Sequence, residues 1–228
     1  MIIYEYPFNE RIRTMLRLED LHERYKFFLQ QTHALQHHVA LTTIFEMLEV
    51  ASRSDLKSDL LQELERQKQI LSGFQSHPNI QKDVLDDVLR EIDKTSSALV
   101  ITLGKTGQSI RENEWLMSIR SRTSIPGGAC EFDLPSYYTW QHRAPDERAA
   151  DIAGWFAPMQ SLIDAVGLLL RLMRASGLQF KIIAHSGSYQ QMLQGKVHQL
   201  PGVMQTGMQA GMLTFTQSFQ QRVAAGEL

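Results

Sequence analysis

Residues 118–140 constrain the fold most strongly, because they interrupt an otherwise helical pattern. Their sequence, SIRSRTSIPGGACEFDLPSYYTW, contains two arginines, a Pro-Gly-Gly turn, one cysteine, an Asp-Leu-Pro break and four aromatic residues. Helix-type spacing of apolar residues flanks this segment on both sides but is missing within it. A segment that gives up regular helical packing and carries arginines at its start is a candidate binding site or interface.

Amphipathic helices are predicted over most of the chain before residue 177. Apolar residues recur at three- and four-residue intervals in residues 8–30, 35–52, 54–72, 80–103, about 107–118 and 148–176. Asn9 is a suitable N-cap for the first helix, with Glu10 in its first turn. Ser54 is a suitable cap for the third, and Gly73 fits its end. A short break at Pro78 joins the third and fourth helices, which predicts an antiparallel hairpin.

The pattern changes after Gly177. The runs LQFKIIAH, SYQQML and KVHQL are short, contain β-branched and aromatic residues, and are separated by glycines, which predicts strands and turns. The segment at 118–140 also suits strands and turns. We therefore predict an α+β fold. A mainly helical domain with long antiparallel helices would comprise residues 1–117 and 148–176. A smaller β-rich domain would be built from two separated segments, residues 118–147 and 177–228.

Composition and length set broad limits. At 228 residues, with 43% apolar and 21% charged residues, the chain can bury a substantial core and is not expected to be disordered. It contains no run of 18 apolar residues and begins without a basic segment followed by an apolar one, so neither a membrane span nor a signal peptide is expected. Cys130 is the single cysteine, which excludes an intrachain disulfide and fits a reducing cytosol.

Arginine placement gives the clearest hint of a partner. From Ala165 to Gly226 there is no acidic residue, although the net charge is −2. The positive charges in that span are too sparse for a nucleic-acid stripe. Arg13 and Arg17 are one helical turn apart, an arrangement that repels unless acidic neighbours such as Glu10 neutralise it. Arg120 and Arg122 alternate, so on a strand both would face one side. Guanidinium groups in these positions suit carboxylate-bearing partners, although solvated surface arginines are the plainer interpretation.

Other motifs give little support for catalysis. The stretch Gly104–Gly107 lacks the glycine and the preceding strand of a phosphate loop. His33, His37 and His38 cluster, but no further ligands at zinc-type spacing accompany them. We therefore expect these histidines to lie at the solvent-exposed start of a helix. The segment from His185 to Ser188 lacks a carboxylate and a nucleophile elbow, so we favour a turn. We expect Asp133 to cap a turn before a proline, and we expect no metal, cofactor or catalytic residue.

Four blocks of sequence carry a family resemblance. They are PFNERIRT with LRLE (residues 7–14 and 16–19), DLKSDLLQELERQ (55–67), RSR through SIPGG and FDLP (120–135), and GSYQQML (187–193). In this order, over roughly residues 3–198, the chain resembles the ZapD family of bacterial cell-division proteins. The pair SIPGG and FDLP is the most diagnostic part of the resemblance.

The resemblance implies a non-enzymatic function. ZapD proteins are cytosolic, symmetric homodimers recruited to the mid-cell division ring. They bind the C-terminal tail of the tubulin-like protein FtsZ through a basic surface, and they bundle its filaments to stabilise the Z-ring. Their fold combines a helical and a β-rich domain. The resemblance assigns the FtsZ-binding surface first to Arg17 and then, less directly, to Arg53, Arg120 and Arg122.

The resemblance weakens after about His198. Family members continue with further strands and basic residues, whereas this chain continues with a segment rich in glycine, methionine and glutamine. We therefore expect an atypical, truncated or divergent C-terminal part. Three alternatives stay open: a helical adaptor for another acidic peptide, a hydrolase using Cys130 or the residues from His185 to Ser188, and a nucleic-acid adaptor.

Overall fold

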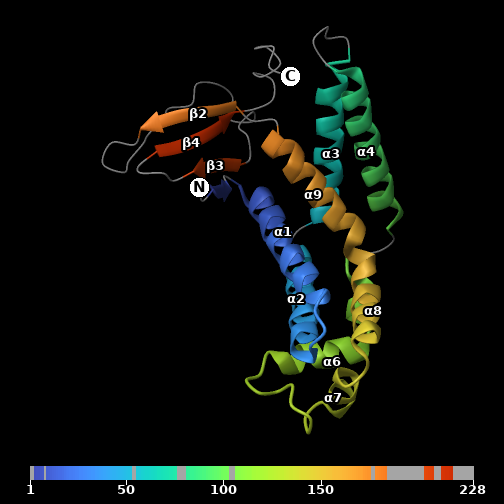
Figure 1. Cartoon of the computed structure of the whole chain (residues 1–228). Coiled ribbons are helices and arrows are strands. Elements are labelled where there is room, and N and C mark those ends of the chain that lie inside the picture. The colour runs from blue at the N-terminus through green and yellow to red at the C-terminus, as the bar shows by residue number, and fades with distance from the viewer. Residues whose placement is uncertain are drawn as a thin grey trace. The chain divides into compact units, whose positions relative to one another are not determined.

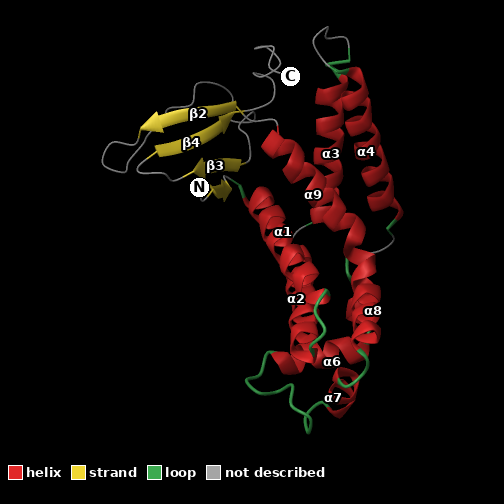
Figure 2. Ribbon diagram, in the orientation of Figure 1, coloured by secondary structure: helices red, strands yellow, loops and turns green. Residues whose placement is uncertain are grey.

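A computed structural model describes residues 3–7, 9–52, 55–75, 81–102, 106–175, 178–183, 203–207 and 212–217. Helices dominate these residues, and the strands are short (Figure 2). The predicted α+β class with a β-rich domain is therefore wrong, and the described chain is mainly helical. The helices are α1 (Glu10–Leu29), α2 (Ala34–Ser52), α3 (Leu56–Ser72), α4 (Lys82–Ile101), α5 (Gln108–Glu112), α6 (Glu114–Thr123), α7 (Pro135–Gln141), α8 (Pro145–Phe156) and α9 (Gln160–Ala175), with a 3₁₀ turn, Ala157–Met159, between the last two.

The prediction failed at residues 118–147, which form helices and turns. Asn113 caps α6 by accepting a hydrogen bond from the backbone N–H of Leu116 at 3.0 Å, and the helix then runs through both arginines. Pro135 begins α7 at a position where a proline loses no helical hydrogen bond. The aromatic residues that favoured a strand lie on this helix, because burial of Tyr137 and Trp140 outweighs their modest helix propensity.

Two pairs of short strands complete the described elements. Strand β1 (Ile3–Pro7) pairs antiparallel with β3 (Val203–Gly207), and β2 (Leu178–Ile183) pairs antiparallel with β4 (Met212–Gln217). In the second pair Phe180 lies opposite Phe215. Both β3 and β4 come after His198, so the C-terminal segment that we expected to be atypical supplies one strand of each pair.

The chain divides into two compact units. Unit 1 comprises Met1–Leu16, Glu63–Asp93 and Gly167–Leu228, and unit 2 comprises Arg17–Gln62 and Lys94–Val166. The boundaries between the units fall inside four helices, α1, α3, α4 and α9. Helices α3 and α4 lie side by side (Figure 1). Within unit 1, Lys68 pairs with Asp93 at 2.6 Å, and within unit 2, Lys57 near the start of α3 donates to the carbonyl of Thr102 just beyond α4 at 2.6 Å. The predicted antiparallel hairpin is confirmed.

In unit 1, polar contacts secure the first strand and the first helix. Asn9 accepts a hydrogen bond from the backbone N–H of Ile12 at 2.9 Å, which confirms the predicted cap of α1. Arg174 of α9 donates through two nitrogens to the two carboxylate oxygens of Glu5, each at 2.7 Å. Such a two-pronged bond fixes direction as well as distance, so it orients β1 against the end of α9.

Aromatic packing organises unit 2. All three tryptophans of the chain, Trp115, Trp140 and Trp155, lie in one cluster with ring centroids 5.4 to 6.1 Å apart, and Tyr137 stacks on Trp140 at 5.6 Å. The Trp140 indole N–H donates to Asp151 at 2.9 Å, so this buried ring keeps a polar partner. The cluster joins α6, α7 and α8.

Among the described residues, the helical stretch Pro145–Ala175 has the length and the apolar composition of a membrane-spanning helix. Half of the apolar window is buried inside the structure, however. The stretch also contains a buried arginine, Arg148, whose hydrogen bonds are described below. These features match a helix that packs within protein.

Candidate partner-binding site

Arg17 lies on the exposed side of α1. The residues of this helix that face the core follow a regular stripe, namely Ile12, Met15, Leu18, Leu21 and Tyr25. Arg17 falls outside that stripe, and its side chain is exposed. Four residues earlier, Arg13 forms a 3.7 Å ion pair with Glu10, as expected for neutralisation of closely spaced arginines.

Arg120 and Arg122 both lie on α6 and point in different directions. Arg120 donates to the carboxylate of Glu49 on α2 at 2.8 Å, whereas Arg122 lies 3.7 Å from the carboxylate of Asp133. Two residues on a helix are separated by roughly 200° of rotation, which explains the divergence. The expectation that they alternate on one face of a strand is wrong. The two arginines therefore pair with different acidic residues, one on α2 and one in the loop that follows α6.

Several residues considered above lie outside the described part of the chain. They are Arg53, the predicted cap Ser54, the predicted break at Pro78, Gly104, Lys105, the residues from His185 to Ser188, and the predicted strand runs SYQQML (188–193) and KVHQL (196–200).

The loop at residues 124–134 is held by its own hydrogen bonds. The N–H of Gly128 donates to the carbonyl of Ile125 at 2.9 Å, and the N–H of Leu134 donates to the carbonyl of Cys130 at 2.9 Å. Gly127 has a φ of +74°, and a Cβ on Gly128 would lie 2.4 Å from the carbonyl oxygen of Arg122. The Pro-Gly-Gly turn therefore needs its two glycines for different reasons, the first for backbone conformation and the second for close approach.

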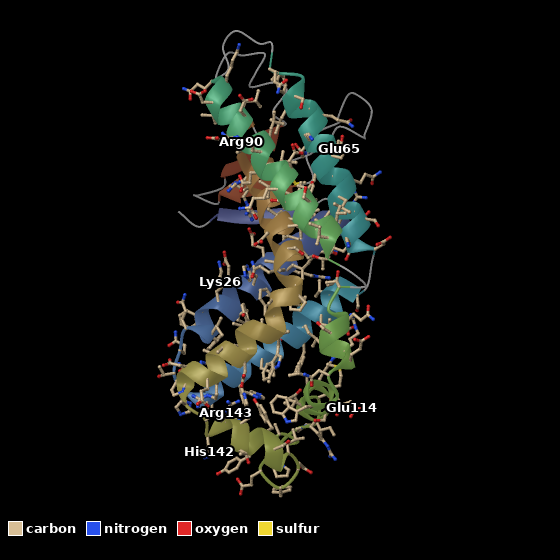
Figure 3. The ribbon with its side chains drawn as sticks, turned by 90° about the vertical axis from the view of Figure 1, so that its right-hand side faces the viewer. Lys26, Glu65, Arg90, Glu114, His142 and Arg143 are labelled. Carbon is tan, nitrogen blue, oxygen red and sulfur yellow. The ribbon has the colours of Figure 1, made fainter. Side chains whose placement is uncertain are left out.

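This loop presents apolar side chains to solvent. Phe132 is 82% exposed and Ile125 is 50% exposed. The thiol of Cys130 donates to Asp133 at 3.3 Å, so the cysteine acts here as a turn residue. Figure 3 shows His142 and Arg143 close together where α7 meets α8, and Arg143 pairs with Glu147 at 2.9 Å.

A buried polar cluster in unit 2 was missed by the sequence analysis. Arg148 is 4% exposed and His37 is fully buried. The Nε–H of Arg148 donates to Nδ1 of His37 at 3.1 Å. Burial is the main cause that lowers the pKa of His37. The sequence contained a signal for the burial of His37, because this residue lies at helical spacing from Leu41 and Ile44 on one apolar stripe.

The adjacent His38 contacts a different helix. Its Nδ1 and the hydroxyl of Tyr137 share a 2.6 Å hydrogen bond. Burial lowers the pKa of His38 and raises that of Tyr137. Within the described residues, no three His, Cys, Asp or Glu side chains are placed to hold a metal ion.

Comparison with known proteins decides the family. The family model described as a cell division protein, ZapD, matches residues 16–211. The chain belongs to the ZapD family. The match extends beyond His198, so ZapD proteins share at least part of the C-terminal segment that seemed atypical. ZapD is a cell-division protein, and a role in cell division follows for this chain.

Individual ZapD proteins are similar in sequence to this chain. A cell division protein ZapD from Janthinobacterium sp. is 66% identical over 200 residues, which cover 88% of this chain and 80% of the relative. The corresponding protein from Ralstonia pickettii is 60% identical over 88% of this chain and 79% of its own length. The ZapD protein from Cupriavidus metallidurans is 57% identical over 215 residues, which cover 94% of this chain and 84% of the relative.

Proposed function

We propose that this ZapD protein binds the C-terminal tail of FtsZ and, as a cytoplasmic homodimer recruited to mid-cell, crosslinks FtsZ filaments. The observation that carries the proposal is the family match over residues 16–211. A homodimer holds two tail sites, so one particle can bridge two filaments. Repeated attachment along a filament then raises the overall affinity without new contacts.

Surface arginines are the proposed contacts for the tail. Arg17 ranks first because it is exposed on α1 and belongs to the first matching block. Arg122 ranks second, since its 3.7 Å ion pair is long and its side chain is 48% exposed. Arg120 ranks third because its 2.8 Å bond to Glu49 is better formed. Exposed pairs contribute at most about 1 kcal/mol, so a partner carboxylate can replace either of them.

Sedimentation of FtsZ filaments tests the proposal. The wild-type protein should bundle and co-pellet with full-length FtsZ, but not with FtsZ that lacks its C-terminal tail. Arg17→Glu should abolish bundling while leaving the circular dichroism spectrum unchanged. Lys26→Glu is the matched control, since it makes the same charge change at an exposed position of α1 beyond the first block.

The outcomes separate the assignments. Bundling that persists in a folded Arg17→Glu variant would remove Arg17 from the site. Equal co-pelleting with and without the tail would refute tail binding, and no co-pelleting with either form of FtsZ would favour the helical adaptor for another acidic partner. Sedimentation equilibrium of the wild-type protein alone tests the homodimer independently of FtsZ.

A further inference from the structure

We propose that His37 and Arg148 form an acid-sensitive latch inside unit 2, which holds α8 against α2 and the α1–α2 turn and opens when His37 gains a proton. The inference is independent of FtsZ binding. It rests on which atoms donate and which accept in a cluster that is closed to solvent.

Arg148 connects the α7–α8 connection beside it with the α1–α2 turn and α2, which lie 116 and 111 positions away in the sequence. Its Nη2 donates to the carbonyl of Thr32 in the α1–α2 turn at 2.6 Å. Its Nη1 donates to the carbonyl of Gln141 at 3.0 Å and to that of Arg143, both at the α7–α8 connection. Its Nε donates to His37 of α2 at 3.1 Å. One buried side chain therefore links the two turns to α2.

The partner of His37 dictates its protonation state. A guanidinium carries five N–H donors and no acceptor, and it does not lose its proton in proteins. Nδ1 of His37 can therefore satisfy the Nε–H of Arg148 only as an unprotonated acceptor. A second proton on this ring would set an N–H against an N–H and place two positive charges side by side in a buried site.

The remaining surroundings of His37 do not offset this conflict. Within the described residues, Nε2 is buried and makes no hydrogen bond of regular geometry. The backbone carbonyls of Gln31 and Leu29 favour a proton on the ring, whereas burial, first, and the charge of Arg148 oppose it. Among the described residues, Arg148 is the charged group whose electrostatic effect on His37 is resolved.

His38 provides a natural internal control. It follows His37 on α2 and also uses Nδ1, but its partner is the hydroxyl of Tyr137 at 2.6 Å. A hydroxyl can either donate or accept. The hydrogen bond between His38 and Tyr137 can therefore persist when His38 gains a proton, with the ring nitrogen as donor, so two neighbouring histidines should respond differently to acid.

Hydrogen exchange on the full-length protein tests the latch. Exchange should be measured at pH 7.5 and 5.5 and corrected for the intrinsic pH dependence of exchange. Peptides that contain Thr32 and Gln141–Arg148 should lose protection at pH 5.5 in the wild type. Once His37 begins to protonate in the open state, the open population rises up to tenfold for each pH unit.

Two substitutions identify the histidine. In His37→Asn the amide oxygen can accept from Arg148 but cannot titrate, so the acid-induced loss of protection should disappear. His38→Asn should keep it. The proposal is overturned if His37→Asn opens with acid as the wild type does, or if His38→Asn alone removes the response.

A measurement on the wild type remains decisive if His37→Asn does not fold. The ¹⁵N shifts of the imidazole distinguish the two neutral tautomers. At pH 7.5 they should show His37 with a proton on Nε2 and none on Nδ1, and this state should persist below the pH at which exposed histidines titrate. A proton on Nδ1 at neutral pH, or titration of His37 with the exposed histidines, would refute the latch.

Discussion

Replacement of Gly107 by alanine should destabilise unit 2 through two separable effects. Gly107 precedes α5 with a φ of +69°, a conformation that costs an alanine about 1–2 kcal/mol. A Cβ at this position would lie 2.1 Å from Cδ1 of Leu48 on α2, far inside the usual carbon–carbon separation of about 3.5–4 Å. Overpacking of this kind typically costs about 1–3 kcal/mol. We expect a total loss of about 2–5 kcal/mol in the free energy of unfolding.

Gly127→Ala is the matched control. Gly127 has nearly the same φ, +74°, but a Cβ there meets no atom within 4 Å. It should therefore show the backbone cost alone, about 1–2 kcal/mol. The difference between the two variants isolates the contact with Leu48, because the backbone terms cancel.

Urea denaturation followed by circular dichroism measures both variants. With a urea m-value of about 2 kcal/mol/M, the contact term predicts a midpoint for Gly107→Ala that is about 0.5–1.5 M below that of Gly127→Ala. In a Leu48→Ala background, Gly107→Ala should lower the free energy of unfolding by no more than Gly127→Ala lowers it in the wild type. The reason is that alanine at position 48 lacks the Cδ1 atom that clashes with the new Cβ. Equal midpoints for Gly107→Ala and Gly127→Ala would refute the reasoning.

Three further predictions follow from the contacts described above. Lys57→Met should remove the ammonium that caps α4 at the carbonyl of Thr102 and lower the thermal midpoint, at a cost of about 0.5–1 kcal/mol. Asn113→Ala should cost about 1 kcal/mol in urea denaturation through loss of the cap bond to Leu116, whereas Asn113→Ser, which keeps a capping oxygen, should cost much less. Because the folded pKa of His37 is below its ordinary value of 6.5, the unfolded chain binds more protons as the pH falls past 6.5. The free energy of unfolding should then decrease by up to about 1.4 kcal/mol per pH unit, and an increase between pH 7 and 5.5 would contradict the prediction.

The long helices were predictable because local spacing determines them. The segments at 8–30, 35–52, 54–72 and 80–103 became α1 to α4 with ends shifted by up to about two residues, the usual uncertainty of helix termini. Asn9 and the break at Pro78 carried the necessary local signals. In these segments, propensity, capping and apolar periodicity all favour the same structure.

Residues 118–147 failed because tertiary packing decided their structure. Tyr137 and Trp140 have aromatic side chains that favour strands in isolation, but here both are buried in a cluster with two other tryptophans. Helices α6 and α7 are only 10 and 7 residues long, so their apolar residues do not repeat often enough to show the helical period. The Pro-Gly-Gly turn was recognised, but its position between two short helices depended on contacts across the chain.

Among the candidate site residues, the exposure of Arg17 could be predicted from the sequence, but the directions in which Arg120 and Arg122 point could not. The exposure of Arg17 follows from its place outside the apolar stripe of α1. The separation of Arg120 from Arg122 depends on a helix that the pattern did not indicate. The link between His37 and Arg148 joins residues 111 positions apart, and in a single sequence no local signal pairs them.

The tryptophan cluster gives the two units different optical properties. Every tryptophan of the chain lies in unit 2, between α6 and α8, so intrinsic fluorescence reports that unit and is nearly silent about unit 1. Unit 1 contains strands and long segments of α3, α4 and α9, which contribute to the circular dichroism signal. Coincident transitions by both methods would mean that the two units unfold together, whereas separate transitions would assign a stability to each unit without any added label.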